Sequence, residues 1–235
     1  NDPKQDGYKA RLVAGGHRQD ETVFRDTQSP TCNIEIIFMV LAIAAAEERH
    51  TAAIDIKTAY LNAVMKGEKV YMDLNPHLAT LFCEIRPEWK KYVDTRGRMT
   101  VELLRALYGC KQSAKLWYDM LVAELVKLGF NENLKAPCCF NMTIMGSQAT
   151  VCVHVDDLLI THDSHEGLMA VIDLIKTSFK DIVVQDKLDL IYLGMKIHRC
   201  ENYDIEVSME DYEKKIVEAW QTDGRAITPG QSNLF

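Results

Sequence analysis

The sequence predicts an α+β fold whose strands form an antiparallel sheet. Strand-like and helix-like segments follow one another in mixed order, without the strict alternation of a doubly wound parallel sheet. A turn at Gly146-Ser147 separates two strand-like runs and indicates a hairpin, which is an antiparallel unit. The clearest helix, residues 113–128, has Leu and Met at helical spacing and is followed by Gly129, a common helix stop.

The chain before that helix is predicted to hold three strands and two helices. Residues 8–14 alternate as a strand does, so that Lys9 and Arg11 share one face. Residues 33–48 form a nearly continuous apolar helix, which Asn33 can cap. The other expected segments are strands at 51–55 and 69–74, a helix at 58–65 and an irregular polar stretch at 81–98.

The chain after that helix is dominated by short apolar runs bounded by turn residues, which is typical of strands. Two later segments have the amphipathic spacing of surface helices. The expected strands lie at 140–145, 150–155, 158–161, within 190–198 and at 204–208, and the expected helices at 166–179 and 210–220.

The composition is that of an ordinary globular protein. Hydrophobic residues make up 47% and charged residues 26% of the 235 residues, which excludes disordered and fibrous classes. The net charge of −7 argues against a simple basic clamp for nucleic acid, although a local basic patch remains compatible with it. We expect no membrane span, because the longest apolar run, residues 36–46, is too short, and we find no signal segment at the start.

Cysteine and histidine give little indication of a metal or disulfide framework. The seven cysteines are odd in number and include no C-x-x-C pair, so we interpret them as buried thiols of a reducing compartment. His162 and His165 have the spacing of a metal-ligand pair but no third partner nearby in sequence. We therefore predict that they lie in a surface loop.

The strongest chemical signal is the adjacent pair Asp156-Asp157 between two aliphatic runs. This pattern places both carboxylates at the tip of a hairpin, where they repel each other and where a divalent cation would relieve the repulsion. An ordinary polar turn is the alternative. Asp55 ends another predicted strand and is either a helix cap or a third carboxylate of the same site. Three such carboxylates are what a two-metal phosphoryl-transfer site needs.

With these motifs in view, the chain resembles the reverse transcriptase domain of copia-type (pseudoviral) LTR retrotransposon Pol polyproteins. The matching blocks occur in the order of that family and extend over most of the chain. They are residues 8–16 (YKARLVAGG), 29–30 (SP), 55–62 (DIKTAYLN), 70–72 (VYM), 103–118 (LLRALYGCKQSAKLWY), 153–160 (VHVDDLLI), 193–197 (LGMKI) and 228–229 (TP).

The resemblance implies a palm-and-fingers polymerase fold, in which an antiparallel sheet carries the catalytic aspartates and helices pack on one face. It implies that Asp55, Asp156 and Asp157 are catalytic and bind two Mg²⁺ ions, with Mn²⁺ as a substitute and the carbonyl of Ile56 as an extra ligand. It also implies partial fingers at 1–50, a palm at 51–200 with a fingers-type insert at about 66–115, and the end of the palm with the start of a thumb at 201–235.

The resemblance further implies a set of nucleotide-binding residues. Lys9 and Arg11 match the strand that grips the triphosphate, and Tyr60 matches the aromatic gate under the sugar of the incoming nucleotide. Gln112 and Lys115 match the nucleotide-contacting start of the long helix, which is an end that favours anions. A solvated strand face, a core tyrosine and a surface helix cap are the respective structural alternatives.

Primer positioning is implied for two segments. His154 precedes the paired aspartates, at a position where the family usually has Tyr, and Leu193, Gly194 and Met195 match the hairpin that places the primer end. Residues 112–115 also depart from the family, because Gln-Ser-Ala-Lys stands where Gln-Ala-Pro-Arg is usual. A plain strand with a bulge glycine is the alternative for residues 193–195.

The expected partners are a primed RNA or DNA template, deoxynucleoside triphosphates and the rest of a Pol polyprotein, with integrase upstream and RNase H downstream. We expect further fingers strands before Asn1 and a thumb after Phe235. The implied location is intracellular, in cytoplasmic virus-like particles or in the nucleus. Two alternatives stay open: a catalytically silent relic serving as a binding or structural module, and another two-metal palm enzyme such as a nucleotidyl cyclase. The presence of all three aspartates argues against the first, and Tyr60 with the 193–195 hairpin argues against the second.

Overall fold

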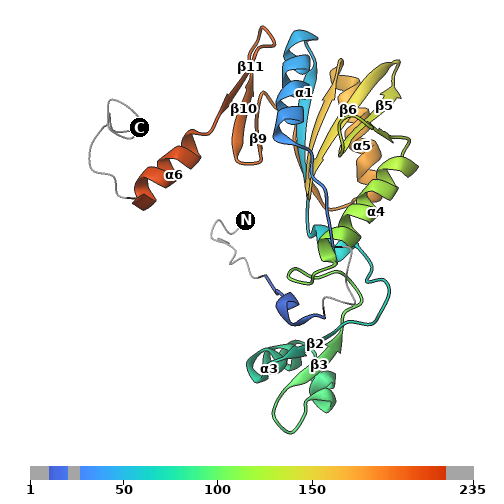
Figure 1. The fold of residues 1–235 in the computed structure, drawn as a ribbon, viewed down its shortest axis with the longest axis vertical. Helices are drawn as coiled ribbons and strands as arrows, with labels where there is room; N and C mark the ends of the chain where they lie inside the picture. The colour runs from blue at the N-terminus through green and yellow to red at the C-terminus, as the bar shows by residue number, and fades with distance from the viewer. Residues whose placement is uncertain (1–10, 21–26, 221–235) are drawn as a thin grey trace, which may run out of the picture.

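The computed structural model describes residues 11–20 and 27–220, and its main element is a six-stranded antiparallel sheet (Figure 1). Its strand order is β4-β5-β6-β7-β1-β8, so β1, from early in the chain, lies between β7 and β8. The strands are β1 (His50–Ile56), β4 (Asn131–Glu132), β5 (Cys139–Ile144), β6 (Ser147–His154), β7 (Asp157–His162) and β8 (Ile182–Gln185). The predicted α+β class with an antiparallel sheet is therefore confirmed.

Two helices, α4 (Ser113–Lys127) and α5 (His165–Ser178), cover one face of this sheet. The ring of Trp117 on α4 meets Phe179 edge to face, at the end of α5, with centroids 5.7 Å apart. The Ser178 hydroxyl donates a hydrogen bond of 2.8 Å to Glu124 of α4. The expected helix layer on one face thus consists of α4 and α5.

A third helix, α1 (Ile34–Ala46), lies on the opposite face. The His162 ring lies against Gly167, which places His162 on the face that α5 covers. Side chains alternate along a strand, so Leu159, three residues before His162, lies on the opposite face, together with its partner Cys152 on β6. There the side chain of Cys152 is hydrogen-bonded to Cys32, which directly precedes α1. As predicted, Asn33 caps α1, accepting a hydrogen bond from the backbone of Glu35.

Two smaller sheets flank the main one. The pair β2 (Tyr71–Leu74) and β3 (Met99–Glu102) is connected by α3 (Pro76–Ile85) and the 3₁₀ helix η2 (Pro87–Tyr92). The other small sheet, β9 (Asp189–Tyr192), β10 (Met195–Arg199) and β11 (Ile205–Ser208), is followed by α6 (Glu210–Trp220). The single-turn helix α2 (Ala59–Asn62) follows β1, and a short 3₁₀ helix, η1 (Gly16–Arg18), lies near the start.

Three local predictions are wrong or incomplete. The stretch 81–98 is not irregular, because α3 and η2 cover most of it and pack on a small core of Leu74, Ala79 and Met99. Residues 11–14 form no strand, and residues 8–10 lie outside the described residues. Strands β4 and β8 were not expected: β4 has only two residues, and β8 follows directly on α5.

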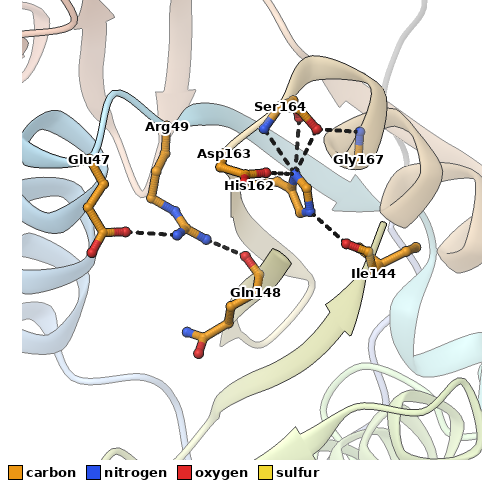
Figure 2. A network of polar contacts seen from close by, with 8 residues as sticks. All are labelled: Glu47, Arg49, Ile144, Gln148, His162, Asp163, Ser164 and Gly167. Atoms are coloured by element: carbon orange, nitrogen blue, oxygen red, sulfur yellow. Dashed lines mark hydrogen bonds and ion pairs between the residues drawn. The ribbon is translucent and has the colours of Figure 1, made fainter. Parts of the chain in front are cut away.

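The end of β7 that is distant from the aspartates holds a buried polar network (Figure 2). His162 is fully buried, so the prediction of a surface loop is wrong for this residue. Its Nδ1 lies 2.8 Å from the carboxylate of Asp163 and accepts a hydrogen bond of 3.0 Å from the backbone of Ser164. Close by, the side chain of Arg49 bonds the carboxylate of Glu47 and the backbone carbonyl of Gln148. These contacts tie together the end of α1, the start of β6, the end of β7 and the start of α5.

Over residues 11–20 and 27–220, no helix is both long enough and apolar enough to cross a membrane.

Candidate active site

The three aspartates predicted to form a site meet at one end of the central sheet. Asp55 on β1 is directly opposite Asp157 on β7, so their Cα atoms lie about 4.5–5.5 Å apart. Asp156 occupies the two-residue turn between β6 and β7. The backbone N–H of Ile56 donates a hydrogen bond of 2.9 Å to the carbonyl of Asp156, which ties the end of β1 to the turn.

The turn that presents Asp156 has an unusual backbone. Val155 has φ of +58°, a left-handed conformation that is rare for a β-branched residue. Its carbonyl accepts a hydrogen bond of 2.8 Å from the indole N–H of Trp117, which is fully buried on α4. The long helix thus holds the turn in place, because such a conformation persists only where the surroundings impose it.

The carboxylates destabilise one another's charged forms. Burial is the main cause that raises the pKa of Asp156, and the charge of Asp55 raises it further. Burial also raises the pKa of Asp157, with additional contributions from Asp156 and Asp55. Nearby cations act in the opposite direction: Arg11 lowers the pKa of Asp156, and Lys57 lowers that of both Asp156 and Asp157.

These electrostatics fit a divalent metal ion, because oxygen ligands with uncompensated negative charge are what such ions prefer. Asp55 is a strand residue and does not cap α2, whose N-cap is Thr58, so the helix-cap interpretation is excluded. The arrangement is nevertheless not closed around an ion. In the described part of the chain, no three His, Cys, Asp or Glu side chains lie together as a complete ligand set. Asp55 instead contacts the ammonium of Lys57.

A hollow of about 300 Å³ opens in front of the aspartates. Tyr60 and Tyr108 lie in its wall with ring centroids 4.6 Å apart, and the guanidinium of Arg11 lies 4.6 Å from the centre of the Tyr108 ring. The residues that line the hollow are Arg11, Tyr60, Tyr108, His154, Val155, Asp156 and Asp157. The lining therefore combines a cation, which can bind an anionic group, two aromatic rings, which can pack against a flat or apolar group, and carboxylates, which can bind a metal ion.

Two of the lining residues, Tyr108 and Val155, were not predicted from the sequence, and Tyr108 is the aromatic one. It directly precedes Gly109, whose φ of +90° marks a sharp turn, and it lies in the same sequence block as Gln112. The backbone of Tyr108 accepts a hydrogen bond of 2.7 Å from Ala14, which brings the N-terminal segment with Arg11 over the ring. The matching block 103–118 contains this tyrosine, but its ring contacts come from residues distant in the sequence, Tyr60 and Arg11, which no local pattern predicts.

Gln112 and Lys115 are placed differently from Arg11 and Tyr60. Gln112 is buried, accepts a hydrogen bond of 3.1 Å from the side-chain amide of Gln19 and lies near the sulfur of Met65. Lys115 is paired with Asp119 one turn further along α4, at 2.5 Å. Neither residue lines the hollow. Lys9 lies outside the described residues.

The segments expected to position a primer lie in two places. His154 ends β6 opposite Asp157 and lines the hollow, and its Nδ1 is buried without a hydrogen-bond partner among the described residues. Leu193 and Gly194 form the two-residue turn between β9 and β10, with φ of +51° and +77°, as a tight hairpin requires. Met195 is buried behind this turn.

Comparison with known proteins identifies the family. Residues 1–229 match the model of the family described as "Reverse transcriptase (RNA-dependent DNA polymerase)". The chain belongs to this family. The predicted resemblance to copia-type reverse transcriptase domains is confirmed, and membership of the family implies dependence on a divalent metal ion.

The similar proteins include two transposon polyproteins of Saccharomyces cerevisiae (strain ATCC 204508 / S288c). The Transposon Ty1-BL Gag-Pol polyprotein is 27% identical over 244 residues, and the Ty1-MR1 polyprotein is 27% identical over 245 residues. Each match covers 99% of this reverse transcriptase chain but only 13% of the polyprotein. Among solved structures, apo telomerase from Candida tropicalis, truncated from its C-terminal domain, has a TM-score of 0.41 and 11% identity, covering 80% of this chain and 43% of that one.

Proposed function

We propose that this chain catalyses RNA-directed DNA synthesis, adding deoxynucleotides from their triphosphates to a primer 3′-hydroxyl. The observation that supports this most directly is the facing pair Asp55 and Asp157, with Asp156 beside them at the mouth of the hollow. Asp55 and Asp157 lie on strand ends and Asp156 in the tight turn between two strands, and rigid elements of this kind hold metal ions more accurately than loops do. Family membership points to the same reaction.

In this proposal Asp55, Asp156 and Asp157, with the carbonyl of Ile56, hold two Mg²⁺ ions, for which Mn²⁺ can substitute. When bound, the ions lower the pKa of the primer 3′-hydroxyl and neutralise the triphosphate and the leaving pyrophosphate. The carboxylates fix the site at which the hydroxyl oxygen attacks the α-phosphorus and the bond to pyrophosphate breaks. The burial and mutual repulsion that raise the pKa values of Asp156 and Asp157 would be relieved by a bound cation.

The incoming nucleotide is proposed to occupy the hollow. Arg11, together with Lys9, binds the triphosphate, and Tyr60 lies under the sugar and disfavours a 2′-hydroxyl. Tyr108 supports the ring of Tyr60 from behind and orients Arg11. Gln112 and Lys115 then act at a distance, because the Gln112–Gln19 hydrogen bond connects the start of α4 with the N-terminal segment.

The primer is proposed to lie against His154 and the turn Leu193-Gly194, with Met195 anchoring that turn in the core. The six-stranded sheet with α4 and α5 is then the palm, within the proposed span 51–200. The insert at about 66–115 and residues 1–50 belong to the fingers, and residues 201–235 lead into a thumb. Residues 221–235 lie outside the described residues.

The remaining proposals concern the longer protein. We propose that the chain is part of a Pol polyprotein with integrase upstream and RNase H downstream, acting on primed RNA or DNA in intracellular particles of the cytoplasm, or in the nucleus. The curated relatives are Gag-Pol polyproteins, of which a chain of this length spans 13%.

Primer extension on poly(rA)/oligo(dT) with Mg²⁺ or Mn²⁺ tests the proposed function. We expect extension by the wild-type chain and none by Asp156→Asn, which removes one carboxylate charge from the site. The matched control is Asp173→Asn on α5, whose exposed carboxylate pairs with Lys176 and does not line the hollow. Extension by Asp156→Asn at the wild-type rate would contradict the assignment. If neither chain extends the primer, the same pair is compared in the full polyprotein, and inactivity of the wild type there overturns the proposal.

A further inference from the structure

Lys57 is a charged residue inside the proposed active site that the mechanism above does not use. It directly follows β1, and its ammonium Nζ is hydrogen-bonded to the carboxylate of Asp55. The backbone N–H of Lys57 donates a hydrogen bond of 3.0 Å to the carbonyl of Asp181, so the base of the side chain is fixed and the Asp55 carboxylate holds its end. The side chain is 44% exposed, and that of Asp55 is 32% exposed.

The ammonium lies within electrostatic range of all three site carboxylates. It bonds Asp55 directly, and its charge also acts on Asp156 and Asp157. In the described part of the chain the carboxylates do not form a complete ligand set for a metal ion, while Asp55 is engaged by Lys57. A cation from the protein therefore holds a carboxylate that a metal ion needs.

We propose that Lys57 is a built-in counter-ion that occupies Asp55 in the metal-free protein and releases it when a divalent ion binds. This inference rests on the proposed function, because it takes Asp55 as a metal ligand. Lys57 is in this view a positioning residue, which sets the concentration of metal at which the site assembles.

Three physical features support an exchange of this kind. An ammonium is a compact single charge on a flexible stem, so it can leave without movement of the backbone. A half-exposed ion pair is held weakly, because water screens it, and a divalent ion carries twice the charge. The ammonium also neutralises part of the repulsion among the aspartates while the metal is absent, which preserves their arrangement on facing strands.

The inference predicts that removing the ammonium strengthens metal binding. The measurement is the affinity of the nucleotide-free and primer-free chain for Mn²⁺, from the electron paramagnetic resonance signal of free Mn²⁺. We expect Lys57→Met and Lys57→Gln to bind Mn²⁺ about three- to tenfold more tightly than the wild type, since a competing charge has gone. Lys57→Arg keeps a cation and is expected to retain the weaker wild-type affinity.

Two variants make the result specific. Lys176→Met removes a lysine with the same exposed fraction of 44% and a carboxylate partner of its own, Asp173, and it should leave Mn²⁺ affinity unchanged because Lys176 does not line the hollow. Asp156→Asn defines which bound Mn²⁺ belongs to the site. Equal or weaker binding by both neutral variants at Lys57, with an Asp156-dependent site present, overturns the role of Lys57 and leaves the proposed function intact. Absence of any Asp156-dependent Mn²⁺ binding overturns the metal site itself, and the inference with it.

Discussion

Tyr60 and Tyr108 are in direct ring contact, with centroids 4.6 Å apart and planes inclined by 44°. Tyr60 comes from the single-turn helix after β1, and Tyr108 from the turn before α4, so the contact joins the two segments that frame the hollow. Both residues are half-buried and line the hollow, and the guanidinium of Arg11 lies over the ring of Tyr108. The pair therefore forms a preorganised aromatic wall beside Asp156.

Replacing Tyr60 by Val is expected to weaken discrimination against ribonucleotides. The smaller side chain leaves room for a 2′-hydroxyl, so the ratio of ribonucleotide to deoxynucleotide incorporation should rise by about tenfold or more. Single-nucleotide primer extension with dTTP and UTP measures this ratio. Tyr60→Phe keeps the ring and should stay close to the wild type, and an unchanged ratio in Tyr60→Val would remove Tyr60 from the role of gate.

Replacing Tyr108 by Ala is expected to weaken nucleotide binding rather than the fold. The change removes the ring that supports Tyr60 and the surface on which Arg11 lies, two contacts of about 0.5–1.5 kcal/mol each. The KM for dTTP should therefore rise about five- to tenfold, while kcat changes less. Tyr108→Phe preserves both contacts and serves as the control. A KM equal to that of the wild type in Tyr108→Ala would show that the ring does not shape the nucleotide site.

The close approach of the N-terminal segment to the turn at Gly109 leads to a third prediction. A Cβ at Gly16 would lie 1.8 Å from the backbone carbonyl of Gly109, which no side chain tolerates. Gly16→Ala should therefore separate the two segments, destabilise the protein by about 1–3 kcal/mol and weaken nucleotide binding through loss of Arg11. Urea unfolding together with the KM for dTTP measures both effects.

The neighbouring residue offers a matched control for that prediction. A Cβ at Gly15 would have its nearest contact at 3.5 Å, with a side-chain atom of His17, and Gly15 has no left-handed φ. Gly15→Ala should consequently leave stability and KM almost unchanged. Equal effects of the two substitutions would mean that the approach of Gly16 to Gly109 is not what holds Arg11 in place.

Local patterns were sufficient to place the aspartates but not to pair them. The aliphatic runs around Asp156 and Asp157 predict a hairpin tip because strands bury such runs and expose charges at turns. That Asp55 faces Asp157 depends on β1 entering the sheet beside β7, a long-range register that no local periodicity encodes. Tyr108 was missed for the same reason, since its ring contacts come from distant segments.

The failure to predict helix α3 has a different cause. Its signal was present, because Asn75 is an N-cap whose side chain accepts a hydrogen bond of 2.9 Å from the backbone of Leu78, and Pro76 takes the first helical position. Residues 69–74 were predicted as a strand and residues 81–98 as irregular, so the helix start at Asn75 and Pro76 was not predicted. Residues 11–14 show the reverse error: they alternate like a strand, but they form no strand in the described part of the chain.

The network around His162 gives a prediction for the pH dependence of stability. The pKa of Asp163 is lowered, first by a hydrogen bond from Ser147 and then by the charges of His162 and Arg49. A carboxyl group whose pKa is lower in the folded state stabilises the fold above its unfolded pKa of about 3.9, and this contribution is lost as pH falls through the folded pKa.

Asp163→Asn should therefore be less stable than the wild type at pH 6, and the difference should shrink as pH falls below about 4. Urea unfolding at pH 3, 4, 5 and 6 measures the difference. Ser147→Ala removes only the largest cause and should lose part of it, whereas a difference that stays constant over this range would show that the Asp163 carboxylate is not held by the network.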